Sequence, residues 1–381
     1  MWFNPFVFTN APFESFRTIC FVLFITIPAG EQSAAISVDI LSDSLDEADE
    51  TFSLQISNAT NATIGDEIGI ITIIDDDGTW MSDTTPIITH LETQHPDNPV
   101  LPQDPVVGFI SHLIEDYGDE WLWRSAMYYR WWYDYDRQHA SNVLTDEVTG
   151  HIKLPRWMRQ RMIVRRQVNH YVKRDGVTET TRHHIEQNYH NALAAMTAML
   201  ENRLFLLGNA PSMADFGMMG PMFRHYGQDS TPEEIMRNTA PAVYEWVARM
   251  WHAKDQVKPE FVSKIPDDAA PLLAEICETH LVQLAANAEA FAEDKERFDM
   301  TVQGCEYRDI AVSQYRVWCL EELRRRFDLL SAEQQETVKA LLPHSQAKVL
   351  WNSEVPVQSG FNRDNHLPFG KAMNVFKGGV P

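Results

Sequence analysis

The spacing of hydrophobic residues changes near residue 100, and this change restricts the fold more than any other feature of the sequence. In "TFSLQIS", Phe52, Leu54 and Ile56 alternate with polar residues, the pattern of a strand with one face in a core and one in water. From Asp104 onward the apolar residues recur every three or four positions, as in helices that bury one face. The first such stripe consists of Ile110, Leu113, Ile114, Tyr117 and Trp121. The chain therefore needs two parts, one β and one mainly α.

The first 80 residues predict a small antiparallel β-sandwich. Three β-type runs, "AAISVDIL", "TFSLQIS" and "IGIITII", are separated by turn-forming stretches without the helical crossover that parallel strands need. This region holds 13 acidic residues against a single basic one, Arg17, and the whole chain holds 54 acidic and 32 basic residues. The resulting formal charge of −22 disfavours nonspecific binding to nucleic acid or anionic lipid, so we expect no nucleic-acid partner.

Carboxylates gather at the ends of the predicted strands. Calcium takes six to eight oxygen ligands, so two acidic loops at one end of a sandwich can form a calcium site, although solvated acidic turns explain the same pattern. Residues 18–77 resemble the second half of a Calx-β domain, a calcium-binding sandwich, through "DETFSLQISNATNATIGD" and the closing "DDD". Residues 1–17 remain unassigned and match none of that family's early strands, so the resemblance is to a partial domain. It implies calcium ligands at Asp43, Glu47, Asp75, Asp76 and Asp77.

The rest of the chain predicts a helical bundle. Asp104 is a suitable N-cap for a helix that begins at Pro105, and further helices are expected near residues 156–172 and 180–200. Ser212 and Asp215 have the spacing of a capping box, in which each side chain binds a backbone N–H at the start of a helix.

In this context the stretch "FLLGNAPSMADFGMMGPMFRHY", followed by "NTAPAVYEWVARMW", resembles the C-terminal domain of a glutathione S-transferase. The resemblance covers residues 98–254, and residues 255–345 are similar to the helical extension of some bacterial members. It implies an all-α bundle in which Ser212 and Asp215 serve folding, not catalysis. It also implies glutathione as co-substrate, transfer of glutathione to apolar electrophiles, a homodimer and a cytoplasmic location. The Calx-β resemblance instead leaves an extracellular or surface location open.

The glutathione site of that family lies in an N-terminal thioredoxin-like domain, which we do not find in residues 1–97. No βαβ pattern is present. Glu14 with Ser15 forms the only Glu-Ser pair, and it lies in a segment without helical periodicity. We therefore expect catalytic incompleteness, with residues 78–97 as a linker and residues 346–381 as an irregular tail. A wall for a small apolar ligand is expected at Tyr117, Trp121 and Tyr128, although core packing of these aromatics is the favoured alternative.

Two further stretches bear on partners. Residues 156–174 contain no acidic residue, and this basic helix can bind an anion or, as we favour, pair with an acidic neighbour. The apolar core of residues 20–30 is too short to span a membrane. The sequence thus predicts a mixed, mainly α protein that is glutathione S-transferase-like but catalytically incomplete. The alternative is a calcium-binding adhesion or regulatory module.

Overall fold

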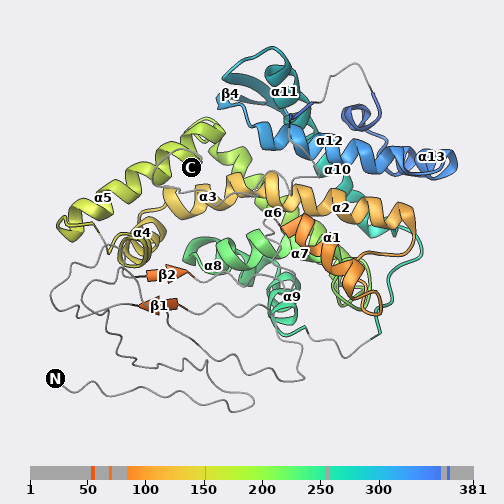
Figure 1. Cartoon of the computed structure of the whole chain (residues 1–381), viewed down its shortest axis with the longest axis horizontal. Coiled ribbons are helices and arrows are strands. Elements are labelled where there is room, and N and C mark those ends of the chain that lie inside the picture. Colours follow the sequence, from red (N-terminus) through yellow and green to blue (C-terminus); the bar gives the residue numbers. More distant parts are fainter. Residues whose placement is uncertain are drawn as a thin grey trace, which may run out of the picture. The chain divides into compact units, whose positions relative to one another are not determined.

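The structure is a computed structural model of the whole chain, and it describes residues 53–55, 68–70, 84–150, 152–253, 258–352 and 358–360 (Figure 1). The chain divides into two compact units, residues 1–52 with 70–73, and residues 53–69 with 74–381. Ile70 is the one residue of the first unit that the structure describes. The second unit contains all of the described helices.

The described strands in the N-terminal region are short. Strand β1 (Ser53–Gln55) lies within the predicted strand "TFSLQIS", and β2 (Ile68–Ile70) lies within "IGIITII". They form a two-stranded sheet, so the predicted sandwich is not confirmed by the described residues.

The helical part matches the predicted class. Its first half contains α1 (Thr84–Gln94), α2 (Pro105–Glu120), α3 (Leu122–Trp132), α4 (Asp134–Val148), α5 (Arg156–Gln167), η1 (Val168–Val172), η2 (Lys173–Asp175) and α6 (Arg182–Leu200). It continues with α7 (Met213–Pro221), η3 (Met222–Tyr226), α8 (Ser230–Thr239) and α9 (Pro241–Trp251). The predicted helices near residues 156–172 and 180–200 are confirmed as α5 with η1, and as α6.

Helix α2 begins where the sequence predicts. The Asp104 carboxylate accepts hydrogen bonds from the backbone N–H groups of Val106 and Val107, at 2.9 and 3.0 Å. Pro105 occupies the first turn, where its missing N–H costs nothing. Trp121 joins α2 to α3 with helical backbone angles, and Figure 1 shows the two helices following one another almost end to end.

Helix α7 crosses α2 at a pair of glycines. A Cβ added to Gly217 would lie 2.4 Å from the Cα of Glu115, and one added to Gly118 would lie 2.8 Å from the carbonyl oxygen of Gly217. Ser111 on α2 also accepts a hydrogen bond from the backbone N–H of Ala214 at 2.9 Å. The two helices therefore pack backbone against backbone at the centre of the bundle.

Helix α1 lies within residues 78–97, a segment that the sequence predicts as a linker. It is fixed at both ends: Thr85 donates a hydrogen bond to Glu115 on α2, and Glu92 accepts from the backbone N–H groups of Val100 and Leu101. The segment that precedes α2 is therefore a docked helix.

The C-terminal extension is mainly helical but contains a β-hairpin that we did not predict. Strands β3 (Arg297–Val302) and β4 (Cys305–Ala311) pair in antiparallel register. Gln303 and Gly304 connect them with positive φ angles of 48° and 81°, as a two-residue hairpin turn requires. The surrounding helices are η4 (Asp267–Ala269), α10 (Ala270–Glu278), α11 (His280–Ala292), α12 (Gln314–Asp328), α13 (Ala332–Leu341) and η5 (Ser345–Leu350).

A buried ion network joins the extension to the bundle. The Arg316 guanidinium on α12 donates to Asp175 at 2.9 Å and to Glu120 on α2 at 3.1 Å. Arg124 on α3 approaches the same Asp175 oxygen at 3.3 Å and stacks over Trp121 with its guanidinium carbon 4.4 Å from the ring centre. These contacts hold α12 against α2, which creates one of the two cavities described next.

Candidate functional site

The first cavity is a narrow cleft between α1, α2 and α12. It has a volume of about 20 Å³, room for roughly one water molecule. Its lining residues recur at helical spacing because each helix contributes one face. They are Thr85 from α1, His112, Glu115, Asp116, Asp119 and Glu120 from α2, and Tyr315, Trp318, Cys319, Glu322, Leu323 and Arg326 from α12.

The cleft is dominated by carboxylates. Its cation, Arg326, is already engaged: it lies 2.8 Å from Nε2 of His112 and 3.1 Å from a carboxylate oxygen of Glu322. Burial and the neighbouring Arg326 lower the pKa of His112 to about 3, so this imidazole is neutral near pH 7. A carboxylate oxygen of Asp116 lies 2.5 Å from Nε2 of His280. Burial raises the pKa of the Glu120 carboxyl. The cleft therefore favours cations over anions.

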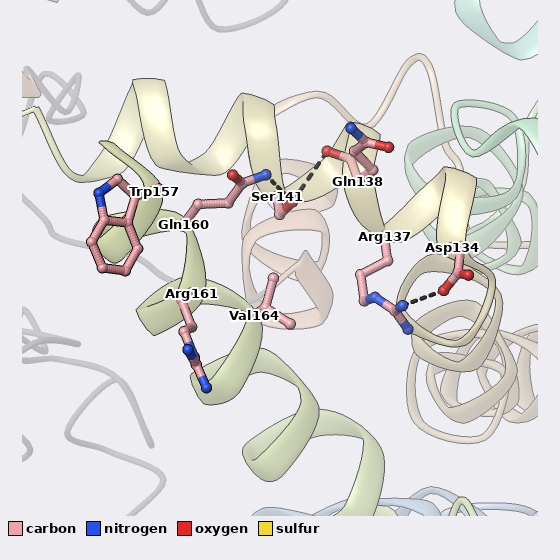
Figure 2. A pocket seen from close by; sticks show the side chains of 8 residues that line it. All are labelled: Asp134, Arg137, Gln138, Ser141, Trp157, Gln160, Arg161 and Val164. Atoms are coloured by element: carbon pink, nitrogen blue, oxygen red, sulfur yellow. Dashed lines mark hydrogen bonds and ion pairs between the residues drawn. The ribbon is translucent and has the colours of Figure 1, made fainter. Parts of the chain in front are cut away.

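The second cavity is an open groove of about 550 Å³ between α4 and α5 (Figure 2). Each helix contributes residues at positions i, i+3, i+4 and i+7, so the groove is lined by two facing helical stripes. The lining residues are Asp134, Arg137, Gln138 and Ser141 from α4, and Trp157, Gln160, Arg161 and Val164 from α5.

Hydrogen bonds hold α5 against α4 at Gln160, whereas Trp157 and Arg161 make no hydrogen bond across the groove among the described residues. The Gln160 amide donates to Ser141 at 2.9 Å and to Asn142 at 3.0 Å, which ties α5 to α4. Arg137 is paired with Asp134. Figure 2 shows Arg161 and Trp157 on the α5 side of the groove, and Trp157 is 65% exposed.

The predicted aromatic wall lies in the core. Tyr117, Trp121 and Tyr128 are at most 2% exposed, and they line neither of the two cavities described above. The Tyr128 hydroxyl donates to Glu186 at 2.5 Å, and Trp121 packs edge to face on Tyr307. A role for these residues in ligand binding stays a prediction.

The capping box of α7 is confirmed and is more extensive than the sequence suggested. Asp215 is fully buried and accepts four hydrogen bonds: from the backbone N–H of Ser212 at 2.9 Å, its hydroxyl at 2.7 Å, the backbone N–H of Leu206 at 2.9 Å and the indole N–H of Trp246 at 2.9 Å. Burial raises the pKa of Asp215, and the four donors partly offset that effect. One carboxylate thus joins α7, α9 and the loop before α7.

The predicted calcium ligands Asp43, Glu47, Asp75, Asp76 and Asp77 lie outside the described residues. Within the described ranges, no group of three or more His, Cys, Asp or Glu side chains could hold a metal ion. The same part of the chain contains no helix that is long and apolar enough to cross a membrane.

The predicted pairing of the basic helix is only partly observed. Arg156 pairs with Asp146 on α4 at 2.7 Å. Arg161 and Arg165, by contrast, are exposed and have no ion-pair partner among the described residues. Sequence reasoning missed both cavities, although the helical spacing of Trp157 and Arg161 was visible in the sequence.

One comparison with known proteins gives a match. The family model for the glutathione S-transferase C-terminal domain matches residues 165–253, from the end of α5 to the end of α9. This segment defines a helical domain of the glutathione S-transferase C-terminal type, and its centre is the Ser212–Asp215 capping box. Neither the curated proteins nor the solved structures give a match. The comparisons do not support the Calx-β resemblance or the bacterial-type extension.

Proposed function

We propose that this chain is a glutathione S-transferase-like protein that is catalytically incomplete and acts as a ligand-binding or dimerising helical module. The observation that carries the proposal is the family match over residues 165–253. The match surrounds the buried carboxylate of Asp215, which holds α7, α9 and their loop together. Glutathione is the co-substrate of this family, and homodimers are common in it.

The acidic cleft beside α1 supports the incompleteness, because it has room for about one water molecule and not for a tripeptide, and because its charges do not suit a thiolate. Glutathione carries one more carboxylate than ammonium group near pH 7, and its reactive form, the thiolate, adds another negative charge. A site that activates this thiol needs a free donor or cation. In the cleft, Arg326 is held by Glu322 and His112, and His112 is neutral.

The described thiols do not offer a substitute nucleophile. Burial raises the pKa of the Cys277 thiol to about 12 and also raises that of Cys305. Cys319 is buried. Because the thiolate is the reactive form, Cys277 and Cys305 are poorly suited to covalent catalysis near pH 7.

Isothermal titration of the full chain with glutathione and with S-hexylglutathione tests the proposal. We expect no binding below millimolar concentrations, and no conjugation of 1-chloro-2,4-dinitrobenzene above the rate in buffer. Micromolar binding of either thiol peptide, or enzyme-dependent conjugation, would overturn the proposal.

A charge control separates two reasons for weak binding. Glutathione diethyl ester has the same size class but no free carboxylate. Binding of the ester without binding of glutathione would identify electrostatic repulsion by the acidic chain, whose formal charge is −22, as the cause. Absence of both would indicate that the described residues form no thiol-peptide site. A dimer in sedimentation analysis would support the dimerising role, and a monomer would remove it.

A further inference from the structure

We propose that the groove between α4 and α5 binds a flat aromatic anion, with the Trp157 indole contacting the ring and Arg161 binding the anionic group. This proposal goes beyond the proposed function, because it involves neither glutathione nor the cleft beside α1. It assigns a role to the basic helix that the sequence singled out.

The shape of the groove fits a small molecule. Its volume of about 550 Å³ lies within the range of about 300–1,000 Å³ typical of small-molecule sites. Trp157 and Arg161 are four residues apart on α5, so their side chains lie on the same face of that helix (Figure 2). The hydrogen bonds from Gln160 to Ser141 and Asn142 hold that face against α4.

The side chains supply an apolar surface and an unpaired charge. Trp157 is 65% exposed, so a planar aromatic ligand can cover its ring and remove apolar area from water. Arg161 has no ion-pair partner among the described residues, and its planar guanidinium can donate two parallel hydrogen bonds to a carboxylate or sulfonate.

The charge balance favours an anion with one negative charge. Asp134 neutralises Arg137 at the opposite side of the groove, which leaves Arg161 as the unpaired charge among the lining residues. Residues 156–174, which include the whole of α5, contain no acidic residue to compete for it. A polyanion such as nucleic acid would meet the surplus of acidic residues that gives the chain a charge of −22, so a small ligand fits better.

A matched pair of probes tests the proposal on the full chain. Naphthalene-2-sulfonate carries the ring and the charge, and naphthalene-2-sulfonamide has nearly the same shape but is neutral near pH 7. Isothermal titration is expected to show at least tenfold tighter binding of the sulfonate. The substitutions Arg161→Gln and Trp157→Ala should each weaken sulfonate binding by about tenfold or more, because a charge-assisted hydrogen bond or a buried aromatic contact contributes that much.

Arg165→Gln is the control, since Arg165 is exposed on the same helix one turn further and does not line the groove. It should leave the affinity unchanged within twofold. All three substituted side chains are exposed, so thermal melting should show that the fold is intact. The proposal is overturned by equal affinity for the two probes, by an absence of sulfonate binding at millimolar concentration, or by an equal effect of Arg165→Gln and Arg161→Gln.

Discussion

The substitution Asp215→Ala tests whether the buried capping box is the main link between α7, α9 and the preceding loop. It removes the acceptor of four hydrogen bonds. The Ser212 hydroxyl can rotate toward another acceptor. The backbone N–H groups of Leu206 and Ser212 and the indole N–H of Trp246 would be left buried without a partner.

Each stranded donor costs about 1–3 kcal/mol, and removal of the buried carboxylate returns part of that cost because its own desolvation is relieved. We therefore expect a net loss of about 4 kcal/mol in the free energy of unfolding. Thermal melting followed by circular dichroism, together with urea unfolding, should measure it.

The chain contains a matched control in the second capping box. Ser331 and Gln334 form the same motif at the start of α13, where both hydrogen bonds are exposed to solvent. Gln334→Ala should cost roughly 1 kcal/mol or less, since water can replace the lost contact. A loss for Asp215→Ala as small as that for Gln334→Ala would refute the reasoning that burial makes the first box a structural centre.

Three further substitutions test the packing, the ion network and a buried histidine. Gly217→Ala places a Cβ 2.4 Å from the backbone of α2 and should lower the free energy of unfolding by about 2–3 kcal/mol in thermal and urea unfolding. Gly150→Ala is the control, because its nearest contact is at 4.0 Å, and it should be nearly neutral. Arg316→Leu removes one of the cations that face buried Asp175 and should lower the free energy of unfolding by about 3 kcal/mol. Amide hydrogen exchange in α12 should become faster. Unchanged exchange there would contradict the role of Arg316 in holding α12 against α2. Burial lowers the pKa of His225 in the folded state to about 3, so the wild type loses stability as the pH falls below about 6.5, where the unfolded chain binds a proton. Between pH 7.5 and pH 5, the free energy of unfolding of the wild type should therefore fall by about 2 kcal/mol more than that of His225→Gln. Urea unfolding of both proteins at the two pH values measures this difference, and an equal change in both would contradict it.

Features that depend on neighbouring residues could be predicted from the sequence. The start of α2 follows from Asp104 and Pro105, and the start of α7 follows from the spacing of Ser212 and Asp215. The β-hairpin also has a local signal, because Phe298, Met300 and Val302 alternate with exposed residues before a Gln-Gly turn. The prediction of a helical extension over residues 255–345 does not include it.

Features that join distant segments could not be predicted. Arg316 and Asp175 are 141 positions apart, and Trp246 and Asp215 are 31 positions apart. The residues of the α4–α5 groove are close in sequence, but two helical stripes become a cavity only when their faces meet at a suitable angle. Periodicity identifies which face of each helix is polar, whereas tertiary packing decides what that face contacts.

The two cavities also differ in charge, and that difference follows from where the acidic residues are placed. In the cleft, the carboxylates of α2 and α12 outnumber Arg326, which is already paired. In the groove, one carboxylate is paired and Arg161 is left over, although acidic residues outnumber basic ones across the chain by 54 to 32. Substitution in the cleft, such as Glu322→Gln, should therefore leave naphthalene-2-sulfonate affinity unchanged, because the probe is bound by α4 and α5. A change as large as that caused by Arg161→Gln would contradict binding of the probe between α4 and α5.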